Sequence, residues 1–187
     1  MAYKIYIDQG HNPVNPNAGA EGNGLREQDI VYRIGVELGA LLEENGNFEV
    51  RLSRPAPTTQ LGSSNTSSLR ARTDAANAWG ADYFISLHTN ASTITSATGS
   101  EALVFSAPSA ASRLGEAILI GLNGETGLRN RGVIERPGLY VLRKTAMPAV
   151  LLELGFITNP NDAALMSGDP EAFARGIYTG ILEYLNL

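Results

Sequence analysis

The sequence predicts an α/β fold, a mostly parallel twisted sheet of about six strands with helices on both faces. Short apolar runs alternate with longer segments in which apolar residues recur at helical spacing. The short runs are apolar throughout, which is typical of parallel strands covered on both faces. The length of 187 residues suits one well-filled core, so we expect a single domain over residues 1–187.

The expected strands are the short apolar runs and the segments that flank polar turns. They are residues 3–8, 48–52, 81–88, 101–105, 139–142 and 149–154. Residues 55–68 and 92–99 are rich in Ser and Thr and poor in large apolar side chains, which predicts loops. Their hydroxyl groups either line a groove for a hydrophilic polymer or are simply solvated.

The expected helices are set by spacing and by their end residues. Apolar residues at Ile30, Ile34 and Leu38 predict a helix over 28–44 that stops at Gly46. Ser67 or Ser68 can cap a helix that runs to Trp79. Further helices are expected at 109–122, from Pro160 for a short stretch, and from Pro170 to near Leu185.

Composition excludes several classes of protein. A net charge of −5 and a pI near 5.0 argue against nucleic-acid binding, which needs a basic face. The chain has no cysteine, so any metal must be bound by His, Asp or Glu, as in catalytic zinc sites. No apolar run approaches the roughly 20 residues of a membrane span, and we expect no membrane association. The N-terminus lacks the pattern of a signal peptide.

Three side chains that can bind a metal or transfer a proton lie at or just after the ends of apolar runs. Glu153 lies in the run 147–157, and a carboxylate there is costly to bury without a partner or a chemical role. The two histidines, His11 and His88, have the same kind of position. Because ligands bind at the carboxyl ends of parallel strands, we expect these three residues to converge on one edge of the sheet.

A metal site also needs a third protein ligand. The segment 10–29 is a Gly-, Asn- and Pro-rich loop that leads into a helix, and it carries a candidate. Glu27 stands just before that helix. It is either a metal ligand or an N-terminal acid stabilised by the helix dipole. A lone histidine is usually a hydrogen-bonded core residue. Two histidines together with a glutamate inside an apolar run, all at matching strand ends, instead favour a functional site.

Seven segments, in order, resemble the motifs of the zinc-dependent N-acetylmuramoyl-L-alanine amidases of the Amidase_3 type. The resemblance spans nearly the whole chain, and seven ordered segments are far more specific than one short motif. The segments are Ile7-Asp8-Gln9-Gly10-His11, Gly24-Leu25-Arg26-Glu27, Phe84-Ile85-Ser86-Leu87-His88-Thr89-Asn90-Ala91, Gly99-Ser100-Glu101, Asn130-Arg131-Gly132-Val133, Leu139-Tyr140-Val141-Leu142-Arg143 and 147–159.

The resemblance implies a hydrolase that holds one Zn²⁺ with His11, Glu27 and His88 and uses Glu153 as the catalytic glutamate. The family cleaves the amide between N-acetylmuramic acid and the L-alanine of the peptidoglycan stem peptide. We assign Asn90 and Arg131 as substrate contacts, the latter because a guanidinium binds a carboxylate bidentately. Arg143 is a further candidate, with solvation or an ordinary ion pair as the alternative.

The chain departs from the family pattern at several positions, but none of these departures removes an expected metal ligand. Residues 12–16 replace a commonly glycine-rich stretch, and Gln28 follows Glu27 where lysine is frequent. Glu101 either orients a zinc histidine or is a plain strand-edge acid. Glu153 follows His88 by 65 positions, and this separation leaves no room for the helical insertion that blocks some relatives, so we expect activity without an activator.

Two other functions remain open from the sequence. One is a zinc carboxypeptidase-like hydrolase that trims stem peptides, and the other is a non-catalytic cell-wall-binding module with structural histidines. For the amidase we expect a monomer acting at the bacterial cell wall as an autolysin or phage endolysin domain. Because anionic wall polymers repel an acidic enzyme, we also expect a tethering module in the natural protein.

Overall fold

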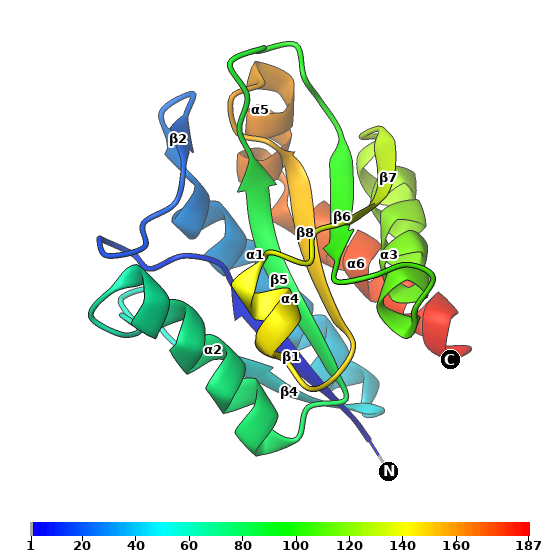
Figure 1. The fold of residues 1–187 in the computed structure, drawn as a ribbon. Helices are drawn as coiled ribbons and strands as arrows, with labels where there is room; N and C mark the ends of the chain where they lie inside the picture. Colours follow the sequence, from blue (N-terminus) through cyan, green and yellow to red (C-terminus); the bar gives the residue numbers. More distant parts are fainter. Residues whose placement is uncertain (1) are drawn as a thin grey trace.

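The computed structural model describes residues 2–187 and has a six-stranded sheet between two layers of helices (Figure 1). The strands are β1 (Tyr3–Gln9), β2 (Glu21–Gly22), β3 (Leu25–Arg26), β4 (Phe48–Leu52), β5 (Tyr83–Asn90), β6 (Ser100–Val104), β7 (Asn130–Glu135) and β8 (Ala149–Phe156). The helices are α1 (Glu27–Asn45), α2 (Asn65–Trp79), α3 (Ala110–Thr126), α4 (Tyr140–Lys144), α5 (Pro160–Gly168) and α6 (Pro170–Leu185).

The sheet is mostly parallel, which confirms the expected fold class. Its strand order is β4-β1-β5-β8-β6-β7, and the first four strands of this order are mutually parallel. β6 runs antiparallel to β8, and β7 is parallel to β6. The connection from β5 to β6 contains no helix, so the chain lacks the crossover that a parallel neighbour needs. The reversal places the start of β6 at the carboxyl end of β8.

Alternation along the strands divides the core into two faces. Ile5, Ile85 and Leu152 point to one face and pack beneath α1, α3 and α6. Phe84 and Leu151 point to the other face, which α2 and α4 cover (Figure 1). His88 and Glu153 have the same parity as Phe84 and Leu151 on their strands, so both belong to the α2 and α4 side.

The expected strand at residues 139–142 is wrong, because this segment forms α4. Its apolar residues Val141 and Leu142 are buried under one side of the short helix, and Arg143 donates its N–H to the Leu139 carbonyl at 3.1 Å. A run of four residues is too short for periodicity to separate a helix from a strand. The sixth strand of the sheet is instead β7, a largely exposed edge strand that lacks an apolar run.

Two further local differences concern the loops. Residues 10–29 include the small ribbon of β2 and β3, which the Gly-rich composition did not indicate. Helix α2 begins earlier than expected, because Ser64 is the N-cap. Ser64 and Ser67 form a reciprocal capping box, with the Ser67 N–H donating to the Ser64 hydroxyl at 3.1 Å. The remaining boundaries agree with the expected ones to within a few residues.

Helices α3 and α6 cross at unusually close range, and Gly180 makes this approach possible. A Cβ atom at Gly180 would lie 2.4 Å from the Ile118 Cα. We expect Gly180→Ala to lower the free energy of unfolding by about 1–3 kcal/mol, because overpacking outweighs the gain in helix propensity. Gly124→Ala on α3 is the control, since its Cβ would meet no atom of the described residues within 4 Å. A thermal unfolding midpoint of Gly180→Ala that equals or exceeds that of Gly124→Ala would contradict this prediction.

Candidate metal centre and its acidic neighbour

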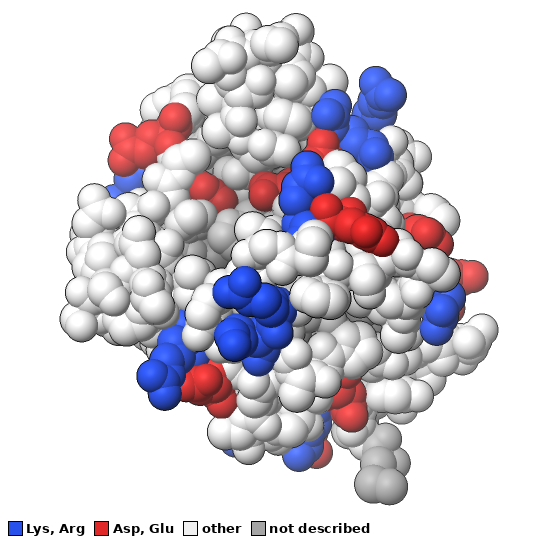
Figure 2. All heavy atoms as spheres, in the orientation of Figure 1, with Lys and Arg blue, Asp and Glu red and all other residues white. Residues whose placement is uncertain are grey.

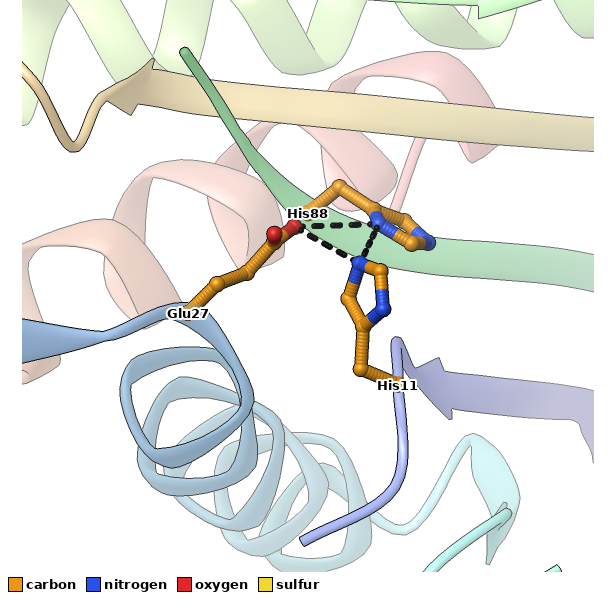
Figure 3. A group of neighbouring side chains, drawn as sticks. All are labelled: His11, Glu27 and His88. Atoms are coloured by element: carbon orange, nitrogen blue, oxygen red, sulfur yellow. Dashed lines mark hydrogen bonds and ion pairs between the residues drawn. The ribbon is translucent and has the colours of Figure 1, made fainter. Parts of the chain in front are cut away.

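Three side chains from separate elements point at one another at the carboxyl end of the sheet (Figure 3). His11 follows β1, Glu27 is the first residue of α1, and His88 lies near the end of β5. The His11 Nε2, His88 Nδ1 and Glu27 Oε1 atoms are each 3.1 Å from the other two. The structure thus brings together the three residues singled out as ligands in the sequence.

The donor set and its spacing fit a zinc ion. In a tetrahedral site, zinc bonds of about 2.0–2.2 Å place the ligand atoms roughly 3.3–3.6 Å apart. The three observed separations of 3.1 Å are slightly shorter than this. Two neutral imidazoles and one carboxylate are also the ligands of open zinc sites in hydrolases, which keep a fourth position for water or substrate.

Glu27 is held rigidly by the backbone. Its Oε1 accepts the Thr89 N–H and its Oε2 accepts the Ala20 N–H, both at 2.9 Å. Burial alone would raise the pKa of Glu27, but the contacts with His11 and His88 hold it well below its usual range. Glu27 is therefore an ionised carboxylate whose charge complements a cation at this point.

Two glycines make room for the side chains of these candidate ligands. A Cβ atom at Gly10 would lie 2.5 Å from the His88 Cε1, and one at Gly19 would lie 2.8 Å from the Glu27 Cβ. The imidazole of His88 and the side chain of Glu27 thus occupy the space that any other residue would need. The sequence shows these glycines only as part of a flexible loop, so their packing role was missed.

Glu153 lies beside the three side chains on the neighbouring strand. Its Cα pairs with that of His88 in the parallel ladder and with that of Glu101 across the antiparallel one. Its Oε2 atom is buried and has no hydrogen-bond partner within residues 2–187. Burial raises the pKa of Glu153 to about 7; His88 lowers it, and Glu27 and Glu101 raise it. This carboxyl is suited to exchanging a proton near neutral pH.

A small cavity of about 140 Å³ opens beside the imidazoles of His11 and His88. Leu69, Leu139 and Leu151 give it apolar walls. On the space-filling surface, acidic side chains lie in the hollow at this end of the sheet, with basic side chains beside it (Figure 2). The centre is therefore accessible from the surface of the molecule.

Comparison with known proteins agrees with this geometry. Residues 5–183 match the family model described as N-acetylmuramoyl-L-alanine amidase. The chain belongs to this amidase family. The amidase is 38% identical over 192 residues to the N-acetylmuramoyl-L-alanine amidase CwlM of Bacillus licheniformis, covering 98% of this chain and 69% of that protein. It is 34% identical over 196 residues to the endolysin of Bacillus phage SPP1, covering 100% of this chain and 68% of that protein.

Solved structures give the same result for the fold of the amidase. The catalytic domain of CwlV, an N-acetylmuramoyl-L-alanine amidase from Bacillus (Paenibacillus) polymyxa, superposes with a TM-score of 0.85 at 30% identity over 98% of both chains. The CwlD amidase from Clostridioides difficile, solved in complex with the GerS lipoprotein, gives a TM-score of 0.90 at 26% identity, again over 98% of both chains. The α/β architecture is that of the family's catalytic domains.

The two residues assigned to the substrate lie at the same edge of the amidase sheet. Asn90 ends β5, and its side-chain oxygen accepts the Ala91 N–H at 2.9 Å. The Nε of Arg131 donates to Glu101, and its guanidinium lies 5.1 Å from the centre of the Phe156 ring. Glu101 thus binds Arg131, and within residues 2–187 it forms no hydrogen bond or ion pair with either histidine.

Sequence reasoning missed a buried ion pair beneath the centre of the amidase. Asp8 and Arg72 are each 1% exposed, and Arg72 Nη1 donates to Asp8 Oδ1 at 2.6 Å. An arginine on a helix is usually solvated, so the sequence carried little signal for this role. Asp8 was visible as an acid at the end of an apolar strand, and it could have been flagged on the same ground as Glu153.

The ion pair makes amidase stability dependent on pH. Burial would raise the pKa of Asp8, but Arg72 and the Ser86 hydroxyl hold it below its usual range. Its contribution is therefore complete above the unfolded pKa of about 3.9 and is lost as pH falls toward the folded pKa. Asp8→Asn should cost about 3–5 kcal/mol of unfolding free energy at neutral pH, since it leaves Arg72 buried and unpaired.

That cost should shrink as the solution is acidified below about pH 4, because the unfolded parent then binds a proton at Asp8 that the folded parent does not, and the parent loses stability. Urea unfolding of parent and Asp8→Asn across this range measures the difference directly. A difference between the two proteins that stays constant with pH would contradict the prediction.

Proposed function

We propose that the amidase is zinc-dependent and that His11, Glu27 and His88 hold the ion. The observation that carries the proposal is the mutual 3.1 Å spacing of one carboxylate oxygen and two imidazole nitrogens. When bound there, zinc supplies a Lewis acid for the amide carbonyl and for the attacking water. The substrate is the amide that joins the lactyl group of N-acetylmuramic acid to L-alanine in peptidoglycan.

Glu153 has the properties of the proton carrier for this reaction. It stands next to His88 on the adjacent strand, and its Oε2 is buried with no partner within the described chain. It would accept a proton from the attacking water and deliver it to the departing alanine amine, acting first as general base and then as general acid. A pKa raised by burial suits both steps.

The rim of the centre offers contacts for the stem peptide. The Arg131 side chain is 33% exposed although Glu101 binds its Nε, so its guanidinium is partly open to solvent. We propose that it binds a stem-peptide carboxylate and that Asn90 hydrogen-bonds the peptide backbone. Asn90 lies on β5, next to the strand of Glu153, and Arg131 on β7 binds Glu101, whose Cα pairs with that of Glu153.

We further propose that residues 1–187 form one catalytic unit that acts, as a monomer, on the bacterial cell wall. Cell-wall action is supported by the family and by relatives that include an endolysin. Among residues 2–187, no helix has the length and apolar character to cross a membrane.

The test combines metal analysis with product analysis. Elemental analysis of the purified protein is expected to give one zinc per chain. Mass spectrometry of digested peptidoglycan is expected to show free stem peptides that begin with alanine. Shortened stems still attached to muramic acid would indicate a carboxypeptidase instead. A protein without metal that binds peptidoglycan but releases nothing would indicate a wall-binding module.

A further inference from the structure

Arg72 makes an unusual set of contacts with the segment that presents His11. It lies on α2, far from the metal centre in sequence, and is 1% exposed. Its Nη1 donates to Asp8 Oδ1 at 2.6 Å and to the Gln9 carbonyl at 2.7 Å. Its Nη2 donates to the His11 carbonyl at 2.5 Å. One guanidinium therefore contacts the chain on both sides of Gly10, at Asp8 and Gln9 before it and at His11 after it.

The same ion pair reaches the strand that carries the second histidine. Asp8 Oδ2 accepts the Ser86 hydroxyl at 2.7 Å, and Ser86 lies two residues before His88 on β5. Asp8 and Ser86 are also paired in the register of β1 and β5. Arg72 thus fixes His11 directly and contributes to the position of His88 through Asp8.

The backbone of His11 needs such a constraint. Its φ of 66° lies in the left-handed region, which residues other than glycine seldom adopt unless the surroundings impose it. The contact that holds its carbonyl comes from Arg72. Without the guanidinium, we expect the backbone at His11 to relax and its imidazole to leave the position that faces Glu27 and His88.

We propose that Arg72 is a positioning residue for the metal centre, acting through His11 and, by way of Asp8, through His88. The inference rests on the proposed function, because it takes these histidines as metal ligands. A role in stability alone explains the contacts poorly. A buried ion pair can often be replaced as a whole by apolar residues without loss of stability, whereas outer partners of metal ligands typically govern metal affinity.

The test measures zinc affinity by competition with a chelator, well below the unfolding temperature of every variant. Arg72→Met is expected to weaken zinc binding about 10–100-fold, the range found for outer partners of metal ligands. Arg72→Lys should recover part of this loss, because an ammonium keeps the charge beside Asp8 but cannot span both carbonyls. The absorption spectrum of the Co²⁺-substituted protein should change in Arg72→Met, because the ligand geometry changes.

Ile177→Ala is the matched control. Ile177 is fully buried on α6, across the sheet from the centre, so its truncation destabilises the fold without touching the ligands. Zinc affinity and the Co²⁺ spectrum should remain those of the parent in this variant. If Arg72→Met does not fold, Arg72→Lys and Asp8→Asn provide the comparison with the same readouts.

The possible results separate the two proposals. If the parent binds zinc and Arg72→Met keeps the parent's zinc affinity and Co²⁺ spectrum, the positioning role is overturned and the proposed function stands. If Arg72→Met does not fold, the same conclusion follows when Arg72→Lys and Asp8→Asn keep that affinity and spectrum. If the parent itself binds no zinc, the proposed function fails and the positioning role fails with it. A loss of affinity in Ile177→Ala as large as in the Arg72 variants would also overturn the inference, since general destabilisation would then account for both.

Discussion

Glu153→Gln is expected to abolish most amidase activity while leaving the fold and zinc affinity unchanged. The amide keeps the shape of the carboxyl group but cannot accept and return a proton. General acid and base catalysis typically contributes 10²–10⁴-fold, so we expect kcat to fall by about that factor. Release of stem peptides from purified peptidoglycan, followed by mass spectrometry, measures the loss.

The controls for this variant separate chemistry from structure. Zinc content should match that of the parent, because Glu153 is not among the three converging side chains. The thermal unfolding midpoint should be no lower than that of the parent, because a buried carboxyl with a raised pKa does not stabilise the fold at neutral pH. Glu116→Gln on α3 removes an exposed carboxylate on the other side of the sheet and should keep full activity. A Glu153→Gln enzyme with parental kcat would refute the assigned role of this residue.

His88→Ala is expected to remove zinc binding together with activity. It deletes one of the three proposed ligands, so the loss of zinc affinity should exceed the roughly 10–100-fold expected from outer partners. Elemental analysis after dialysis and chelator competition measure it. Asn90→Ala, two residues further along β5, serves as the comparison, since its side chain lies outside the ligand set and its zinc content should stay that of the parent. Stoichiometric zinc in His88→Ala would exclude this centre as the metal site.

The fold and the meeting of the two histidines followed from simple rules. Apolar strands and helical spacing predicted the sheet, and the rule for strand carboxyl ends predicted that His11, His88 and Glu153 would lie at one edge. Glu27 remained open, because a helix-start acid has a good structural reason to be there without a metal. The tertiary structure favours the ligand role, because Glu27 Oε1 lies 3.1 Å from a nitrogen of each imidazole.

The elements that sequence reasoning missed share a physical cause. α4 is too short for its apolar residues to show helical spacing. β7 is an exposed edge strand that lacks an apolar run, and it is defined by its pairing with β6. Arg72 is read as a solvated helix residue until its long-range contacts are known. Local patterns therefore locate buried strands well, but partners that lie about 60 residues apart in the chain require the tertiary structure.

The three converging side chains come from the end of β1, the start of α1 and the end of β5, and no two of them are close in sequence. An unfolded chain therefore has no preformed place for the proposed zinc ion, and the free energy of binding it would become free energy of folding. By mass action, free zinc at about a thousand times its dissociation constant would add roughly 4 kcal/mol to stability. The supply of metal in the surroundings would then govern how long this enzyme survives there as well as how fast it works.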